Sequence, residues 1–157
     1  NEQWLSIKEK MLAQLDAISS QTKTGLLPDF MWVDEQGARV ADPDTIESKY
    51  DGAYSYNACR LPYNLAQSQD KTSQKLGKKM LDFFMKQRNI YAGYDLKGNA
   101  LHQYQAASFI APVSYAAENG DGYLKLVQQN KFIFMQDLST ENYYDATMTT
   151  MIALQLF

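Results

Sequence analysis

The chain has 157 residues, of which 45% are hydrophobic and 21% charged, so it can form one domain with a sizeable core. Its net charge of -3 and its scattered lysines and arginines argue against a nucleic-acid partner. One cysteine and one histidine exclude a disulfide framework and a His/Cys zinc cluster, and no apolar run approaches the roughly 20 residues of a membrane span.

The first predicted element is a helix over residues 4–18, where apolar side chains recur at steps of three and four: Trp4, Ile7, Met11, Leu15 and Ile18. The chain opens inside this pattern without an initiator methionine, which indicates a mature or cut chain. A segment without clear periodicity follows from Thr22 to about Gly52. A loop of that length in a compact domain is usually functional or disordered, and residues 29–33 (DFMWV) are too aromatic for disorder.

The remainder of the chain is predicted to be helical. A second helix is expected from about Ala53 to Ala66, with Pro62 as a kink or break. A third follows Asp70, a good N-cap, and its apolar stripe is formed by Leu76, Met80, Phe83 and Phe84. A turn-rich link with a small hairpin near residues 97–98 leads to helices at about 103–118, 121–135 and 141–155.

Six helices without a convincing pair of strands predict an all-α fold. The helix–loop–helix rhythm is typical of stacked helical hairpins, as in α-toroids. Cys59 is predicted to be a small buried residue, and His102 a surface or capping residue. Four phenylalanines on the helix stripes are predicted to lie in the core: Phe83, Phe84, Phe132 and Phe134.

Four segments stand out in order along the chain: GLLPDF (25–30), YSYNACRLPYNLA (54–66), YQAASFIAPVSYAA (104–117) and ENYYDATMTTMIALQLF (141–157). Together they resemble the C-terminal half of glycoside hydrolase family 8, which includes endoglucanases, lichenases, chitosanases and xylanases. The resemblance implies that residues 1–157 form half of a catalytic domain, with six of the twelve helices of an (α/α)6 barrel. It implies a polysaccharide substrate, no cofactor and, because polymeric glycans lie outside the cell, secretion.

The family's proton-donating glutamate belongs to the N-terminal half, so the resemblance implies that this chain alone is not a competent hydrolase. Half a toroid would expose the apolar seam on which the missing helices pack. We therefore expect the chain to associate with its N-terminal half or to form a homo-oligomer through that seam.

The segment YSYNACR departs from the family's common pattern at one position. Many members carry a YDAxR-like motif whose aspartate is the general base, and the matching residue here is Asn57, which cannot accept a proton at neutral pH. The departure resembles a branch, including lichenases and chitosanases, that uses a glutamate from the preceding loop. Glu47 is the candidate, with Asn57 orienting a water and Arg60 keeping the carboxylate ionised.

Several alternatives stay open for these residues. Asn57 could instead pin the loop, Asp44 or Asp51 could be the base in place of Glu47, and Arg60 could pair with an acid inside the barrel as part of the scaffold. Asp29 could bind sugar hydroxyls or cap the loop. The remaining candidates for sugar stacking are Trp32, Tyr54, Tyr56, and one or both of Tyr143 and Tyr144.

Two functional interpretations follow. The first is part of an inverting endoglycosidase acting on β-1,4 or mixed β-1,3-1,4 glucan, or on chitosan. The second is a non-catalytic carbohydrate-binding remnant in which Asn57 marks a lost base. A Glu47 carboxylate directed into the same cleft as Asn57 would favour the enzyme, and one that faces solvent would favour the remnant. A third interpretation is an unrelated α-toroid with chance matches.

Overall fold

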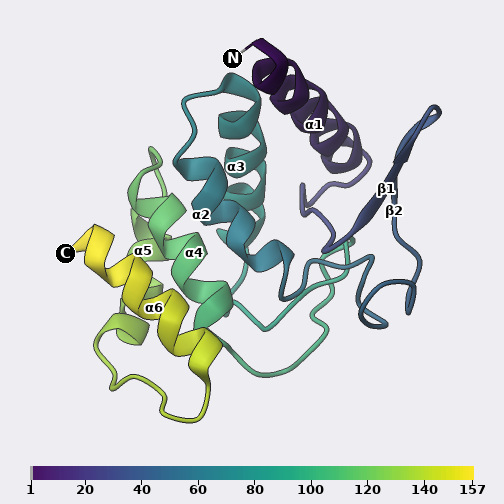
Figure 1. Cartoon of the computed structure of the whole chain (residues 1–157). Helices are drawn as coiled ribbons and strands as arrows, with labels where there is room; N and C mark the ends of the chain where they lie inside the picture. The colour runs from purple at the N-terminus through teal and green to yellow at the C-terminus, as the bar shows by residue number, and fades with distance from the viewer. Residues whose placement is uncertain (1) are drawn as a thin grey trace.

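The computed structural model describes residues 2–157. Within them the chain forms six α-helices, one two-stranded hairpin and two short 3-10 helices (Figure 1). Their bounds, in chain order, are α1 Glu2–Ser20, β1 Met31–Asp34, β2 Gly37–Val40, η1 Ala58–Arg60, α2 Leu61–Ala66, α3 Lys71–Phe84, α4 Ala107–Glu118, α5 Leu124–Asn130, η2 Lys131–Phe134 and α6 Tyr143–Leu156.

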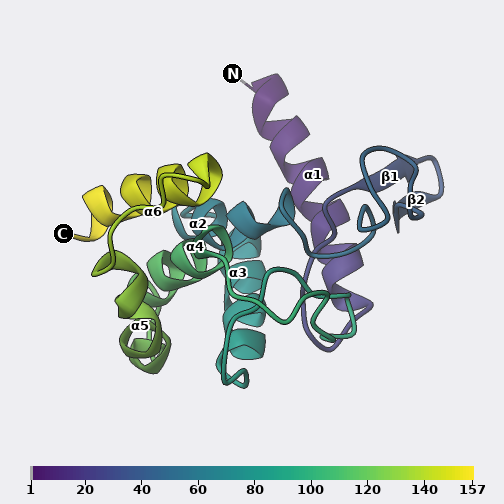
Figure 2. The same ribbon diagram turned by 90° about the horizontal axis from the view of Figure 1, so that it is seen from below.

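Helix α4 is at the centre of the helical array. It packs against α2 on one side and α6 on the other, and it also contacts α3 and α5. Figure 1 shows α2, α4 and α6 side by side with their N-terminal ends toward the same side of the molecule. At the far end α1 packs on α3 and on β2, so α1 and α6 lie at opposite ends of the array, as Figure 2 also shows.

Local sequence accounts for the helices that matter most to the core. Helix α3 begins after Asp70, whose carboxylate accepts hydrogen bonds from the backbone N–H groups of Thr72 (2.8 Å) and Ser73 (3.3 Å). Its stripe is buried, with Leu76, Met80 and Phe84 at 0% exposure. Helix α4 (ASFIAPVSYAAE) is almost entirely buried, which suits a central helix of small and apolar residues.

The predicted helix over residues 53–66 is wrong in its first part. Residues 53–57 are not helical; the helical segment begins with η1 and continues as α2. Pro62 therefore lies in the first turn of α2, where a proline costs no hydrogen bond, instead of kinking a longer helix. The predicted helix over 121–135 is likewise two shorter pieces, α5 and η2.

The hairpin β1–β2 was not predicted, and it occupies part of the long aperiodic segment. Met31 pairs with Val40 and Asp34 with Gly37, in antiparallel register. Gly37 has φ +113°, which explains a glycine at the turn. Each strand has only four residues and none of them is fully buried, so period-2 alternation of apolar residues is missing.

The predicted core is mostly correct. Cys59, Phe83 and Phe84 are buried, and Phe134 is half-buried against the core. Phe132 is the exception, with 38% of its surface exposed on η2. Near residues 97–98 the expected hairpin is reduced to a single bridge between Tyr94 and Ala100, and Tyr94 also pairs with Tyr54.

Candidate active site

The segment that carries Asn57 meets a loop folded over it, residues 42–52, which we call the Glu47 loop. The Asn57 side-chain Nδ2 donates a hydrogen bond to Glu47 Oε2 at 2.9 Å. Glu47 is exposed and Asn57 half-buried, so the pair lies at the surface, just before η1 and α2. A solvated carboxylate held by an amide is an arrangement that can accept a proton from water.

Arg60 contacts the other side of the same amide. Its Nη2 donates to Asn57 Oδ1 at 3.2 Å and its Nε donates to the Asn57 carbonyl at 3.3 Å. The amide is thus bridged between a guanidinium and a carboxylate, and both of its polar atoms are used. Arg60 is joined to Glu47 through Asn57, so its position fixes the orientation of the amide.

Asp51 shapes the Glu47 loop from inside. Its side chain is 1% exposed, and its carboxylate accepts hydrogen bonds from four successive backbone N–H groups: Thr45 (3.0 Å), Ile46 (2.6 Å), Glu47 (3.2 Å) and Ser48 (2.9 Å). Burial raises the pKa of Asp51, but these backbone donors together outweigh it and lower the pKa below the usual value. A carboxylate whose oxygens are occupied in this way holds the loop and is a poor general base.

Asp44, the other alternative base, is exposed in the same loop. It has a left-handed backbone with φ +56°, and its N–H donates to the Ser48 carbonyl at 3.0 Å. Glu47 is therefore the loop carboxylate for which the structure records a hydrogen bond to the Asn57 side chain.

Asp29 holds the segment that carries Asn57 in the same way that Asp51 holds the Glu47 loop, by accepting hydrogen bonds from its backbone N–H groups. Its Oδ1 accepts from the backbone N–H groups of Ser55 (2.9 Å), Asn57 (3.2 Å) and Ala58 (2.7 Å). Burial raises the pKa of Asp29, and the three backbone donors oppose that rise. Of the two predicted roles for Asp29, these contacts favour capping of the segment over binding of sugar hydroxyls.

The backbone segments that carry Asp29 and Asp51 are hydrogen-bonded to each other. The Asp29 N–H donates to the Ala53 carbonyl at 2.7 Å, and the next N–H, of Phe30, donates to the Asp51 carbonyl at 2.9 Å. The segment after Pro28 thus runs beside residues 51–53, between the loop bearing Glu47 and the segment bearing Asn57.

The predicted aromatic residues have different surroundings. Tyr54 is fully buried, with its ring against Phe84 and Phe109, so it offers no face to a sugar in this structure. Tyr56 is 37% exposed and borders the site. Tyr144 is half-buried, and its hydroxyl donates to the Tyr56 carbonyl at 3.2 Å.

The other two predicted aromatic residues, Tyr143 and Trp32, are both exposed. Tyr143, at the start of α6, is 83% exposed. Trp32 is 37% exposed on β1, where its ring centroid lies 5.8 Å from the Arg39 guanidinium carbon. Neither is brought into a recorded contact with the Glu47–Asn57 pair.

Three ring-bearing residues beside the site were not predicted. Tyr104 shares a 3.2 Å hydrogen bond with Tyr56 through the two hydroxyls, and His102 lies between the rings of Tyr104 and Tyr50. The only signal in the sequence was that Tyr104 opens the segment YQAASFIAPVSYAA; nothing in its spacing placed it near Tyr56.

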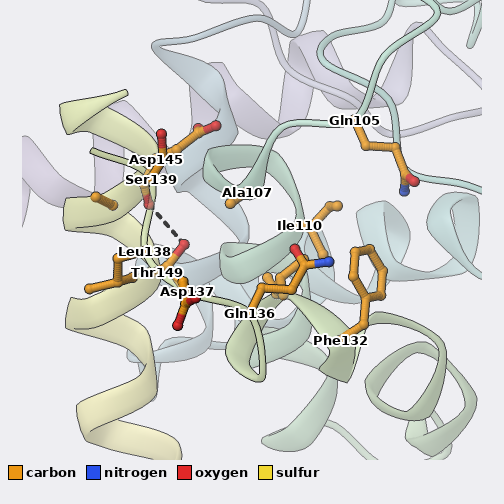
Figure 3. A pocket seen from close by; sticks show the side chains of 12 residues that line it. Gln105, Ala107, Ile110, Phe132, Gln136, Asp137, Leu138, Ser139, Asp145 and Thr149 are labelled. Carbon is orange, nitrogen blue, oxygen red and sulfur yellow. Dashed lines mark hydrogen bonds between the residues drawn. The ribbon is translucent and has the colours of Figure 1, made fainter. Parts of the chain in front are cut away.

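A cavity of about 220 Å³ lies between the N-terminal part of α4, η2 and α6 (Figure 3). Asp145 and Thr149 of α6 line one side, and Phe132 lines the other. Asp145 Oδ1 accepts from the Ser108 N–H at 2.9 Å, so this carboxylate caps the start of α4. The Thr149 hydroxyl donates to the Asp145 carbonyl at 2.8 Å.

Residues 2–157 include no group of three or more His, Cys, Asp or Glu side chains that could hold a metal ion. Over the same range, no helix is both long and apolar enough to cross a membrane.

The chain is similar to known glucanases in sequence and in structure. A curated "Beta-glucanase" from Niallia circulans is 26% identical over 125 residues, which cover 73% of this chain and 31% of that protein. The solved "Apo Structure of Beta-1,3-1,4-glucanase from Paenibacillus sp.X4" superposes with a TM-score of 0.88 at 22% identity, covering 99% of this chain and 44% of that one. The chain thus spans less than half the length of either relative.

The structural likeness confirms the predicted fold: the six helices are arranged as in part of an (α/α)6 β-glucanase. The sequence also matches a family profile, described as "Glycosyl hydrolases family 8", over residues 1–156. A match over nearly the whole chain shows the family that the segments around Asn57 had suggested. The chain belongs to glycoside hydrolase family 8.

Proposed function

We propose that residues 1–157 form the C-terminal half of the catalytic domain of an inverting endo-β-glucanase. Its substrate would be β-1,4 or mixed β-1,3-1,4 glucan, with chitosan as the alternative. The observation that carries the proposal is the 2.9 Å hydrogen bond from Asn57 Nδ2 to Glu47 Oε2, which joins the loop carboxylate to the residue at the usual base position. Family membership and the two glucanase relatives support the substrate class.

In this proposal Glu47 is the general base. Asn57 occupies one lone pair of the carboxylate, and the others remain available to accept a proton from water. The water attacks the anomeric carbon, its proton passes to Glu47, and the bond from that carbon to the leaving oxygen breaks. Asn57 and Arg60 act as positioning residues, because the guanidinium holds the amide in the orientation that donates to Glu47.

The leaving oxygen needs a second carboxyl group as its acid. Inverting glycosidases hold the two carboxyl groups about 6.5–9.5 Å apart so that the water fits between them. We assign the acid to the rest of the domain, because this chain spans 44% of the solved glucanase and the resemblance puts the acid in the other half. The 157-residue chain alone is then expected to be inactive, and the whole protein to be secreted.

The surfaces at the two ends of the helical array support a partner that completes the barrel. Trp4, Leu5 and Met11 on α1 are each at least 59% exposed, and on the opposite side Leu154 of α6 is 80% exposed and Phe157 is 91% exposed. Apolar side chains exposed at both ends are expected where the remaining helices pack. The N-terminal half of the same protein is the proposed occupant, and a homo-oligomer is the alternative.

The second candidate, a non-catalytic carbohydrate-binding remnant, requires a site without a base. A carboxylate that meets Asn57 favours the enzyme, because a lost base would leave the amide without an acid to orient. A binding module would release no sugar from glucan, whether Glu47 is present or replaced.

The test is reducing-sugar release from mixed-linkage β-glucan and from chitosan. We would compare the whole natural protein that contains these residues, the 157-residue chain, and the Glu47→Gln and Asp44→Asn variants of the whole protein. We expect Glu47→Gln to lower the rate by at least about 100-fold, since loss of a general base costs that much. Asp44→Asn, a matched change in the same loop, should keep most of the rate; the reverse order would contradict the assignment.

A further inference from the structure

A row of aromatic rings connects the Glu47 loop to the segment that carries Asn57. Tyr50, in the Glu47 loop, lies edge-on to His102, with ring centroids 5.2 Å apart. The His102 and Tyr104 rings are 5.1 Å apart, and the Tyr104 and Tyr56 hydroxyls are 3.2 Å apart. Tyr56 directly precedes Asn57 in the chain. The row therefore starts on the loop that bears Glu47 and ends beside the residue to which Glu47 is hydrogen-bonded.

The last two rings of this row are fixed and yet exposed. The Tyr56 ring packs edge-on against buried Phe109 at 5.0 Å, and its carbonyl accepts from the Tyr144 hydroxyl. The hydroxyl of Tyr104 is hydrogen-bonded to the hydroxyl of Tyr56. Nevertheless 51% of the surface of Tyr104 is exposed, against 37% for Tyr56. Burial, followed by the hydrogen bond to Tyr104, raises the pKa of Tyr56, so the Tyr56 hydroxyl stays protonated at neutral pH.

We propose that Tyr104, together with Tyr56, forms a sugar-binding subsite beside the Glu47–Asn57 pair, for one pyranose ring of a β-linked glucan. This inference rests on the proposed function and adds to it a residue that binds substrate. The C–H face of a pyranose packs on an aromatic ring, and the hydroxyl pair can both donate to and accept from sugar hydroxyls. His102 and Tyr50 are positioning residues, which hold the Tyr104 ring against the Glu47 loop.

A purely structural role would account for the contacts of Tyr104 but not for its exposure. Packing alone is served by burying the ring, as the protein does with Tyr54 and Tyr94, which are at most 1% exposed. Tyr104 instead keeps about half its surface toward solvent while its hydroxyl is held in place. An immobilised and exposed ring loses little side-chain entropy when a ligand packs on it.

The test compares Tyr104→Ala with Tyr104→Phe in the whole natural protein. Two quantities are measured: kcat and KM on mixed-linkage β-glucan, and the Kd of a β-glucan oligosaccharide by calorimetry in a Glu47→Gln background. We expect Tyr104→Ala to raise KM and Kd about three- to tenfold, because the ring contact is lost. Tyr104→Phe keeps the ring and should stay within about twofold, which corresponds to at most one weak hydrogen bond.

Two further variants serve as controls. Phe132→Ala removes another exposed ring, 38% exposed on η2, and should leave KM and Kd unchanged. Tyr104→Leu keeps apolar volume but not the flat face, so it should behave like Tyr104→Ala and covers the case in which the alanine variant folds poorly.

The outcomes separate this inference from the proposed function. If the unaltered protein hydrolyses β-glucan while Tyr104→Ala and Tyr104→Leu leave both KM and Kd unchanged, the subsite is refuted and the catalytic proposal stands. If the unaltered protein releases no sugar but binds the oligosaccharide, with weaker binding in both variants, the subsite stands and the catalytic proposal fails. If the unaltered protein does not bind glucan at all, both are wrong.

Discussion

The helical array and the segment from Thr22 to Asn57 are held together by different interactions. In the helices, apolar burial dominates: Leu76, Met80 and Phe84 of α3 are fully inaccessible to solvent. In the loop segment, two carboxylates organise the backbone, with Asp51 accepting from four N–H groups and Asp29 from three. The residues proposed for catalysis, Glu47 and Asn57, lie in the segment that the two carboxylates organise.

The helical array and the loop segment should respond differently to amino-acid substitution. A truncated core side chain removes contacts for several helices at once, so its effect spreads through the array. A lost carboxylate leaves a few N–H groups without partners and frees one turn. We therefore expect core substitutions to act on global stability, and carboxylate substitutions to act more on the placement of Glu47 and Asn57.

The largest effect on stability is expected for Phe84→Ala. Phe84 is completely buried and its ring contacts Tyr54, Phe83 and Tyr94, so the substitution leaves a cavity in the centre of the core. We expect a loss of about 4 kcal/mol of unfolding free energy, measured by urea denaturation of the whole protein. Phe132→Ala, the same change at an exposed ring, should cost less than about 1 kcal/mol; equal losses would show that burial does not decide the outcome.

Asp29→Ala is expected to have the next largest effect. It leaves three backbone N–H groups of residues 55–58 without their acceptor, which should cost about 2–3 kcal/mol. Because Asn57 is one of those donors, kcat on β-glucan should fall as well. Asp29→Asn retains an acceptor oxygen and should lose much less of both; if the alanine and asparagine variants behave alike, the three hydrogen bonds are not what holds the segment.

The pH dependence of stability should report the contribution of Asp51 to the Glu47 loop. The pKa of Asp51 is lower in the folded protein than its unfolded value of 3.8, so its contribution is present above pH 3.8. As the pH falls from 3.8 through the folded pKa, the unfolded state binds the proton first and that contribution is lost. Thermal scans between pH 2 and pH 6 should show a shallower acid slope for Asp51→Asn than for the unaltered protein; parallel curves would refute the role of this carboxylate.

The smallest effect compares one substitution in the two regions. Gly37, in the hairpin turn, has φ +113°, so Gly37→Ala should cost about 1 kcal/mol through backbone strain. Gly77, inside α3, has room for a methyl group at 3.6 Å from the Leu65 Cβ, so Gly77→Ala should stabilise the protein by about 0.5–1 kcal/mol. Chemical denaturation measures both, and the same sign for the two would contradict this distinction.

The helical region was predicted well from the sequence, because the features that form a helix lie in residues close together in the chain. The stripe of α3 and the cap at Asp70 are both visible in consecutive residues. The family resemblance, carried by the segments around Asn57 and Glu47, named these two residues as candidates, and the structure joins them by a hydrogen bond. The helix expected from Ala53 was wrong, because residues 53–57 are bound by Asp29 and Tyr94, which are distant in the sequence.

The parts of the site that were missed depend on distant contacts as well. Tyr104 reaches Tyr56 across 48 residues, and no periodicity encodes that approach. Tyr54 was expected to face a sugar, but its neighbours Phe84 and Phe109 bury it, which spacing alone does not reveal. Asp51 was predicted as an alternative base, but its carboxylate accepts hydrogen bonds from four backbone N–H groups, which favours a structural role.

The most direct test of the account is rescue of a Glu47→Ala variant of the whole protein by azide. Azide has no proton to lose, so it can attack the anomeric carbon without a general base, in the space vacated by the side chain. The account predicts that Glu47→Ala is nearly inactive in water alone, and that azide restores the rate and yields a glycosyl azide of inverted configuration. A Glu47→Ala variant that keeps its activity, or that azide does not rescue while the protein remains folded and still binds glucan, would contradict the assignment of Glu47 as the base.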